Sequence, residues 1–129
     1  MLHGALAPYA ALLGALMIVL SLRVSLARMR ARVSLGWGED PVLMARVRAF
    51  GNFAEWAPMA LLLLALAAAA GAPATALHAG GALLVLGRVL HPLQLDGRLF
   101  TPLRFLGMVA TYAAIALAAF YLLRAGAGV

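Results

Sequence analysis

The chain has 129 residues, of which 66% are hydrophobic and only 11% are charged, and its mean hydropathy is +1.02. A soluble domain of this size needs more charge to cover its surface, so we expect a single integral membrane domain over residues 1–129. The chain has no cysteine, which excludes disulfides, thiolate nucleophiles and sulfur-ligated metals, and we expect no metal site. The net charge is +6, but the arginines cluster beside apolar segments, which favours contact with anionic membrane lipid over nucleic acid.

The first predicted helix covers residues 5–24. It holds the uncharged run from Ala5 to Leu22, which is just long enough to span a bilayer with help from its flanks, and Pro8 lies in its tolerant first turn. We expect this segment to be retained, because no Lys or Arg precedes it and no small-residue cleavage site follows it. The stretch from Arg23 to Asp40 is then a polar, basic connection.

The other helices are predicted from helix-start signals and one long uncharged segment. Asp40-Pro41 and Thr101-Pro102 each pair an N-cap residue with a proline in the first turn. Trp56 to Gly87 contains no charged residue and would form a helix about 48 Å long, too long for one span, so "AGAPAT" at Ala70–Thr75 should break it. We therefore predict an all-α, four-helix membrane bundle with helices at 5–24, 41–70, 74–93 and 102–123.

The placement of arginine predicts the orientation. Six arginines lie between Arg23 and Arg48 and three between Arg88 and Arg104, whereas the hairpin after the second helix has none and the C-terminal tail has only Arg124. By the positive-inside rule, both basic connections face the cytoplasm and both termini face the periplasm of a bacterial inner membrane.

Several polar residues lie inside or beside the apolar segments at one depth. Counted from the hairpin, Glu55 and Arg88 lie about 22 Å and about 21 Å from the outer ends of their helices. On the second helix, Arg48, Asn52 and Glu55 follow i, i+4, i+7 spacing and share one face. On the third, Arg88 and His91 are i, i+3 neighbours. We predict one polar layer made of Arg48, Asn52, Glu55, Arg88, His91 and Arg104.

Two interpretations of this layer are open from the residues alone. In a structural interpretation the arginines extend to the interface, Glu55 pairs with Arg88, Asn52 bonds between helices, and His91 is interfacial. In a functional interpretation, one carboxylate against three arginines leaves cations uncompensated, and an anionic ligand supplies the missing charge.

Two motifs carry a family resemblance. "RAFGNFAEWAP" and "GRVLHPLQLDGRLFTPLR" resemble motifs of the membrane-associated proteins in eicosanoid and glutathione metabolism (MAPEG), which include microsomal glutathione transferases and leukotriene and prostaglandin E synthases. Arg88 and His91 match the Arg-x-x-His of the prostaglandin synthase type, and Pro102 and Arg104 match its Pro-x-Arg. The expected four-helix topology agrees over essentially the whole chain.

The resemblance implies a homotrimer that binds glutathione as co-substrate, without a metal, in clefts between subunits that open toward the cytoplasm. The activity it implies is a transferase or peroxidase acting on a lipophilic electrophile that arrives through the bilayer. Glu55 would bind the ammonium group and arginines the carboxylates, with the second-helix residues of one subunit meeting those of helices three and four across the interface. Arg104 would be catalytic and hold the thiolate. The implied glutathione-binding residues are Arg23, Arg48, Asn52, Glu55, Arg88 and His91.

Some positions and alternatives limit what the resemblance implies. The chain departs from the synthases at Phe50, Leu95, Phe105 and Met108, so a specific eicosanoid activity is not implied. One alternative is a small multidrug-type transporter with Glu55 as its cation site, although the carboxylate of that class lies in helix one and helix one here has none. Another is a non-catalytic membrane scaffold, which predicts no ligand dependence.

Overall fold

The computed structural model describes residues 3–94 and 101–128. Its long helices are α1 (His3–Ala31), α2 (Pro41–Ala69), α3 (Ala74–Leu90) and α4 (Pro102–Gly126), and the short 3-10 helix η1 (His91–Gln94) follows α3. Each long helix, with η1 extending α3, is long and apolar enough to cross a membrane. The described residues contain no strand, which confirms the predicted all-α, four-span architecture.

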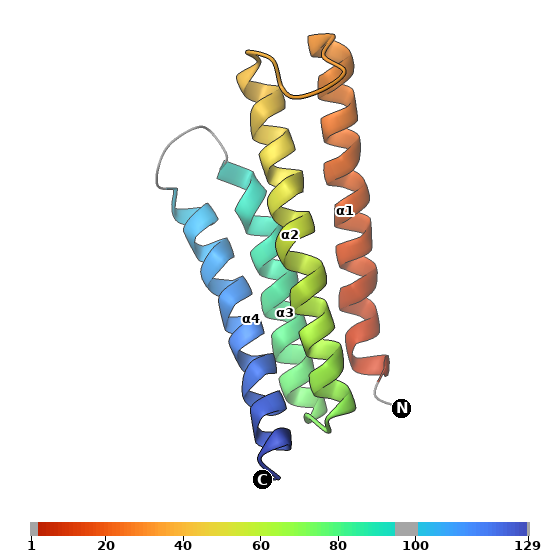
Figure 1. Cartoon of the computed structure of the whole chain (residues 1–129), viewed down its shortest axis with the longest axis vertical. Helices are drawn as coiled ribbons and strands as arrows, with labels where there is room; N and C mark the ends of the chain where they lie inside the picture. Colours follow the sequence, from red (N-terminus) through yellow and green to blue (C-terminus); the bar gives the residue numbers. More distant parts are fainter. Residues whose placement is uncertain (1–2, 95–100, 129) are drawn as a thin grey trace.

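Consecutive helices run antiparallel, and α2 and α3 form the centre of the bundle (Figure 1). α1 packs against α2 and α3 on one side, α4 packs against the same pair on the other, and the described parts of α1 and α4 make no contact. The start of α1, the end of α4 and the α2–α3 hairpin lie at one end of the molecule, and the α1–α2 loop, η1 and the start of α4 lie at the opposite end (Figure 1). Among the described residues, the arginine-rich α1–α2 connection and the helix ends that carry Arg88 and Arg104 therefore lie toward a single end, as the predicted orientation requires.

α1 is longer than predicted. It continues to Ala31 rather than ending at residue 24, because the residues after Arg23 include good helix formers and neither glycine nor proline. Arg32 ends it in the left-handed conformation (φ 54°), and Val33 N–H donates to Arg28 O at 3.2 Å, as in a Schellman motif. The predicted connection from Arg23 to Asp40 therefore begins as helix, and only its second part is a loop.

α2 begins at the predicted Pro41 and ends at Ala69, one residue before the predicted end, and hydrogen bonds define both ends. The Asp40 carboxylate accepts from two backbone N–H groups of the first turn, each at 2.8 Å, and Pro41 is the first helical residue. At the other end Gly71 adopts φ 89°, and Ala72 N–H donates to Ala67 O at 3.0 Å. Glycine favours this conformation because it lacks a Cβ, so the "AGAPAT" segment turns the chain tightly into α3.

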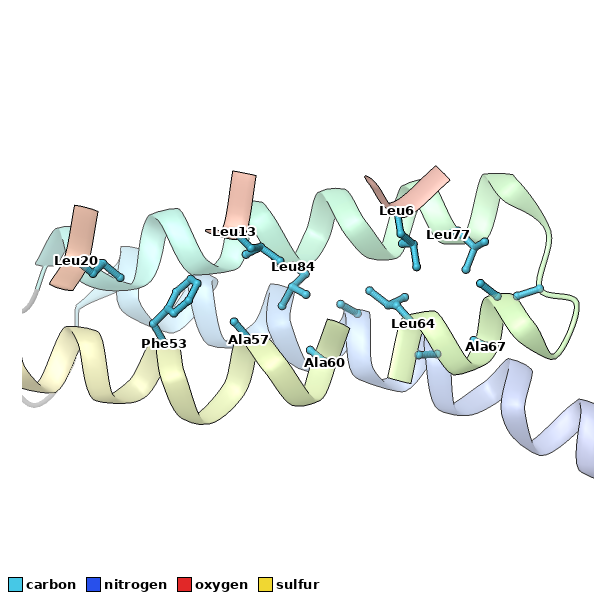
Figure 2. Packing of buried hydrophobic residues seen from close by; sticks show 14 of the residues in the cluster. Leu6, Leu13, Leu20, Phe53, Ala57, Ala60, Leu64, Ala67, Leu77 and Leu84 are labelled. Atoms are coloured by element: carbon cyan, nitrogen blue, oxygen red, sulfur yellow. The ribbon is translucent and has the colours of Figure 1, made fainter. Parts of the chain in front are cut away.

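All four long helices contribute to the core, which combines large side chains with small ones. Leu6, Leu13 and Leu20 are spaced by seven residues on α1 and point toward the α2–α3 pair (Figure 2). The facing surface of α2 is rich in alanine, which lets the helices approach closely. Large residues complete the packing: Phe53 and Leu64 from α2, and Leu77 and Leu84 from α3.

The adjacent glycines of α3 serve contacts within one chain. A Cβ on Gly80 would lie 2.5 Å from Leu64 Cδ2, and a Cβ on Gly81 would lie 2.4 Å from the Tyr9 ring. Tyr9 also hydrogen-bonds His78 Nδ1 at 3.1 Å. These two glycines therefore let α3 approach α2 and α1 closely.

Candidate functional site

Arg88 lies at the meeting point of three helices. Its side chain is only 1% exposed, and its guanidinium group donates in three directions. Nε donates to Thr111 Oγ1 at 3.0 Å, and Nη1 donates to Asn52 Oδ1 at 2.6 Å. Nη2 lies 3.5 Å from both Gly107 O and Met108 Sδ. Arg88 on α3 is therefore bound to α2 through Asn52 and to α4 through the other three residues.

Every acceptor in these contacts is electrically neutral. Thr111 Oγ1 donates to Gly107 O at 2.9 Å, which leaves its lone pairs for Arg88 Nε–H. The hydrogen-bonding capacity of the buried polar atoms is satisfied, since no buried side-chain nitrogen or oxygen among the described residues lacks a partner. The positive charge of Arg88, however, is not neutralised by these acceptors, and a buried charge in a membrane protein is costly unless it is paired.

A close crossing of α3 and α4 explains why Arg88 is buried. A Cβ on Gly87 would lie 2.6 Å from Gly107 O, and a Cβ on Gly107 would lie 2.8 Å from Gly87 O and His91 N. These two glycines let the backbones touch, which brings Arg88 next to Thr111 one turn along α4. Thr111 and both glycines were not among the predicted site residues. The small-xxx-small spacing of Gly107 and Thr111 is the feature of the sequence that indicates a close helix contact here.

The predicted cationic residues gather around His91. The imidazole is 5% exposed at the junction of α3 and η1. Arg104 is half-buried in the first turn of α4, and Arg48 is exposed on α2. The charges of Arg48, Arg88 and Arg104 all act on the His91 ring. We call these four residues the cation layer, and it is assembled within one chain.

Glu55 lies outside this layer in the single chain. Its side chain is exposed, whereas Asn52 is half-buried and contacts Arg88. The alternative that Glu55 forms a structural ion pair with Arg88 is therefore wrong. The reason is angular, because three residues at roughly 100° each turn Glu55 about 60° away from Asn52 on the helix. Beside it, the Trp56 ring contacts Tyr112 of α4 at 5.3 Å between centroids.

Arg23 takes a different place from the other predicted site residues. It is exposed on α1, and its backbone carbonyl accepts from Arg46 Nη1 at 3.3 Å. Because α1 and α4 lie on opposite sides of the α2–α3 pair, the described chain does not bring Arg23 together with Arg104.

The residues at which the chain departs from the motifs of the family lie in different surroundings. Phe50 packs against the core, Met108 contacts Arg88, and Phe105 is 53% exposed. Leu95 and Arg98 lie outside the described residues.

The two sequence motifs meet within one subunit. The resemblance implied that Asn52 would meet Arg88 across a subunit interface, but the 2.6 Å hydrogen bond joins them in the same chain. The arrangement of the helices is the reason, because α2 runs antiparallel to α3 and parallel to α4, so that the first half of α2 lies beside the last turns of α3 and the first half of α4 (Figure 1).

Comparison with known proteins now gives the family. The sequence model of the MAPEG family matches residues 6–124, which is most of the chain. The chain belongs to the MAPEG family. Two curated relatives, the inner membrane protein YecN of Escherichia coli strain K12 and that of strain O6:H1, are each 35% identical over 109 residues, covering 84% of this chain and 82% of the relative. No solved structure matches the chain. Together with the four apolar helices, these relatives support an integral inner-membrane MAPEG protein.

Proposed function

We propose that the chain is a membrane-embedded, glutathione-dependent transferase or peroxidase that acts on lipophilic electrophiles. The observation that carries the proposal is the cation layer: Arg88 has only neutral acceptors among the described residues, and Arg48 and Arg104 add two further positive charges near the buried His91. A tripeptide with two carboxylates and a thiolate supplies the negative charge that this layer lacks. Membership of a family of glutathione-using proteins supports the same ligand.

The roles follow from exposure. Arg48 and Glu55 are both exposed on α2, so the first is available to a ligand carboxylate and the second to its ammonium group. Arg104 is half-buried at the start of α4, beside His91 in the cation layer. A cation close to a thiol lowers the pKa of that thiol and favours the thiolate, which is the nucleophile. Arg104 is therefore the proposed catalytic residue.

The proposed chemistry begins with this thiolate. With an alkylating substrate, the sulfur forms a bond to the electrophilic carbon and the leaving group departs with its electron pair. With a lipid hydroperoxide, the sulfur attacks the terminal oxygen, the O–O bond breaks, and the lipid alcohol leaves after protonation. A second glutathione then reduces the resulting sulfenic acid to glutathione disulfide and water. Both substrates reach the site through the bilayer.

Exposed charges on α2 support a homotrimer. In a single chain Arg48 and Glu55 would face acyl chains or headgroups, and a carboxylate inside the bilayer normally faces a protein interior or a wet cavity. Neighbouring subunits in a trimer cover this face and form the ligand cleft, which opens toward the cytoplasm while both termini are periplasmic. Native mass spectrometry from mild detergent tests the assembly, and spectra with only monomer or dimer would exclude it.

The decisive test of the function uses the purified protein in detergent. Glutathione should raise the melting temperature, and the protein should conjugate glutathione to an activated aryl chloride or reduce a lipid hydroperoxide. A scaffold predicts neither stabilisation nor product. A transporter predicts proton-driven uptake of an organic cation into liposomes without glutathione.

A further inference from the structure

The contact with Arg88 fixes the orientation of the Asn52 carboxamide. A carboxamide has an oxygen that accepts hydrogen bonds and an amino group that donates them, whereas a guanidinium group only donates. The atom 2.6 Å from Arg88 Nη1 must therefore be Asn52 Oδ1. The amino group consequently points away from Arg88.

Arg88 has little capacity left for a ligand. Its Nε is bound by Thr111, and its Nη2 faces Gly107 O and Met108 Sδ. The side chain is 1% exposed, and the crossing at Gly87 and Gly107 leaves no room for the helices to rearrange around it. A ligand carboxylate would have to displace contacts that join three helices.

We infer that Arg88 is a positioning residue, which clamps Asn52 with its oxygen inward and its amino group toward the ligand. Asn52 shares its broad face of α2 with Arg48 and Glu55. With the amino group outward, Asn52 donates to a carboxylate or peptide carbonyl oxygen beside Arg48. It does not accept from the ammonium group that is proposed to lie near Glu55. The clamp stands on the contacts alone, whereas the identity of the ligand rests on the proposed function.

Asn52→Asp tests the orientation by the sign of two effects. The substitution keeps an oxygen facing Arg88 but replaces the outward amino group by a second oxygen. We expect a higher melting temperature, because Arg88 gains a charged partner. We expect glutathione binding to weaken by about tenfold or more, because a donor is lost and a like charge faces the ligand carboxylate. Binding that is equal or tighter would overturn the donor role, since an acceptor for ammonium would improve as a carboxylate.

A double-mutant cycle of melting temperatures tests the contact between Arg88 and Asn52 without any ligand. In the Arg88→Met background, Asn52→Asp should lower the melting temperature, because the carboxylate then has no cation beside it. An equal shift in both backgrounds would overturn the clamp. If Arg88→Met gives no folded protein, Arg88→Lys with Asn52→Asp replaces it, and recovery of the melting temperature by the second change is the expected result.

Two matched substitutions of Thr111 test whether Arg88 positions Asn52 for the ligand. Thr111→Val removes the acceptor for Arg88 Nε, while Thr111→Ser retains it. We expect calorimetry to show weaker glutathione binding for Thr111→Val and wild-type binding for Thr111→Ser, although Thr111 itself is fully buried. Equal binding by the two variants would contradict the positioning role. If wild-type protein binds no glutathione, the proposed function fails, and the melting cycle alone decides the clamp.

Discussion

At the residue scale, Glu55 is the most sensitive probe of the proposed ligand. Its carboxylate is exposed on α2 within one turn of Asn52, and the ligand ammonium group is its proposed partner. Loss of a charged partner in such a contact costs about 2–5 kcal/mol, so Glu55→Gln should weaken glutathione binding roughly 30-fold or more. Isothermal titration calorimetry measures this, with Glu39→Gln in the exposed α1–α2 loop as the control. Equal affinities for wild type and Glu55→Gln would show that the carboxylate does not contact the ligand.

Arg104 should affect the chemistry of the thiol more than the binding of the peptide. Removing its positive charge by Arg104→Ala should raise the pKa of the bound thiol, because the thiolate loses the cation that favours it. Thiolate absorbance of the glutathione complex, followed against pH, should shift to higher pH. Arg124→Ala, an exposed arginine at the other end of α4, is the matched control. An unchanged titration for Arg104→Ala would remove Arg104 from the catalytic role.

The spacing of polar residues predicts their gathering but not their individual partners. The i, i+4, i+7 pattern and the depth count correctly bring Asn52, Arg88 and His91 to one level. They do not determine that Asn52 rather than Glu55 meets Arg88, because that depends on how α2 is rotated against α3. The partner of Thr111 is unpredictable for a similar reason, since its small-xxx-small spacing with Gly107 indicates a close helix contact but not which helix they face.

At the element scale, the α3–α4 crossing should be the least tolerant place for added volume. Gly107→Ala would put a methyl group 2.8 Å from backbone atoms of α3, which cannot move away as a side-chain tip can. We expect destabilisation of about 1–3 kcal/mol, the usual range for overpacking. Gly14→Ala is the control, because nothing lies within 4 Å of its added Cβ, and it should keep or raise stability through helix propensity.

Thermal unfolding in detergent compares the two alanine variants. If Gly107→Ala melts at the same temperature as Gly14→Ala, the crossing is looser than its contacts indicate. The same pair bears on binding, because a displaced α4 would also move Arg104.

Helix starts and turns are predictable here because they depend on local chemistry. Asp40 with Pro41 and the glycine of the hairpin act on neighbouring backbone groups, and both appear as expected. The predicted end of α1 lies too early because the arginines after residue 22 indicate the membrane boundary and not the end of the helix. Charge marks where a helix leaves the bilayer, whereas a helix ends only where backbone geometry changes, here at Arg32.

At the scale of the whole molecule, the prediction to test is orientation. The start of α1 and the end of α4 lie at the hairpin end, and the arginine-rich α1–α2 connection lies at the other end (Figure 1). A reporter that is active only in the periplasm should therefore work at Val129 and fail in the loop at Ser34–Trp37, because arginine-rich connections stay in the cytoplasm. The reverse pattern of reporter activity would show that the orientation is opposite to the predicted one, with the cation layer toward the periplasm.

The dependence of Arg88 on two other helices also bears on how the protein is made. α3 leaves the ribosome before α4, so Arg88 reaches the membrane when Asn52 is present and Thr111 and Gly107 are not. α3 also has the lowest hydropathy of the four spans, 1.3. A cation without its acceptors favours the headgroup region over the bilayer interior. We therefore expect α3 to settle at its final depth only when α4 has been inserted beside it, so that synthesis of the last helix completes the insertion of the one before.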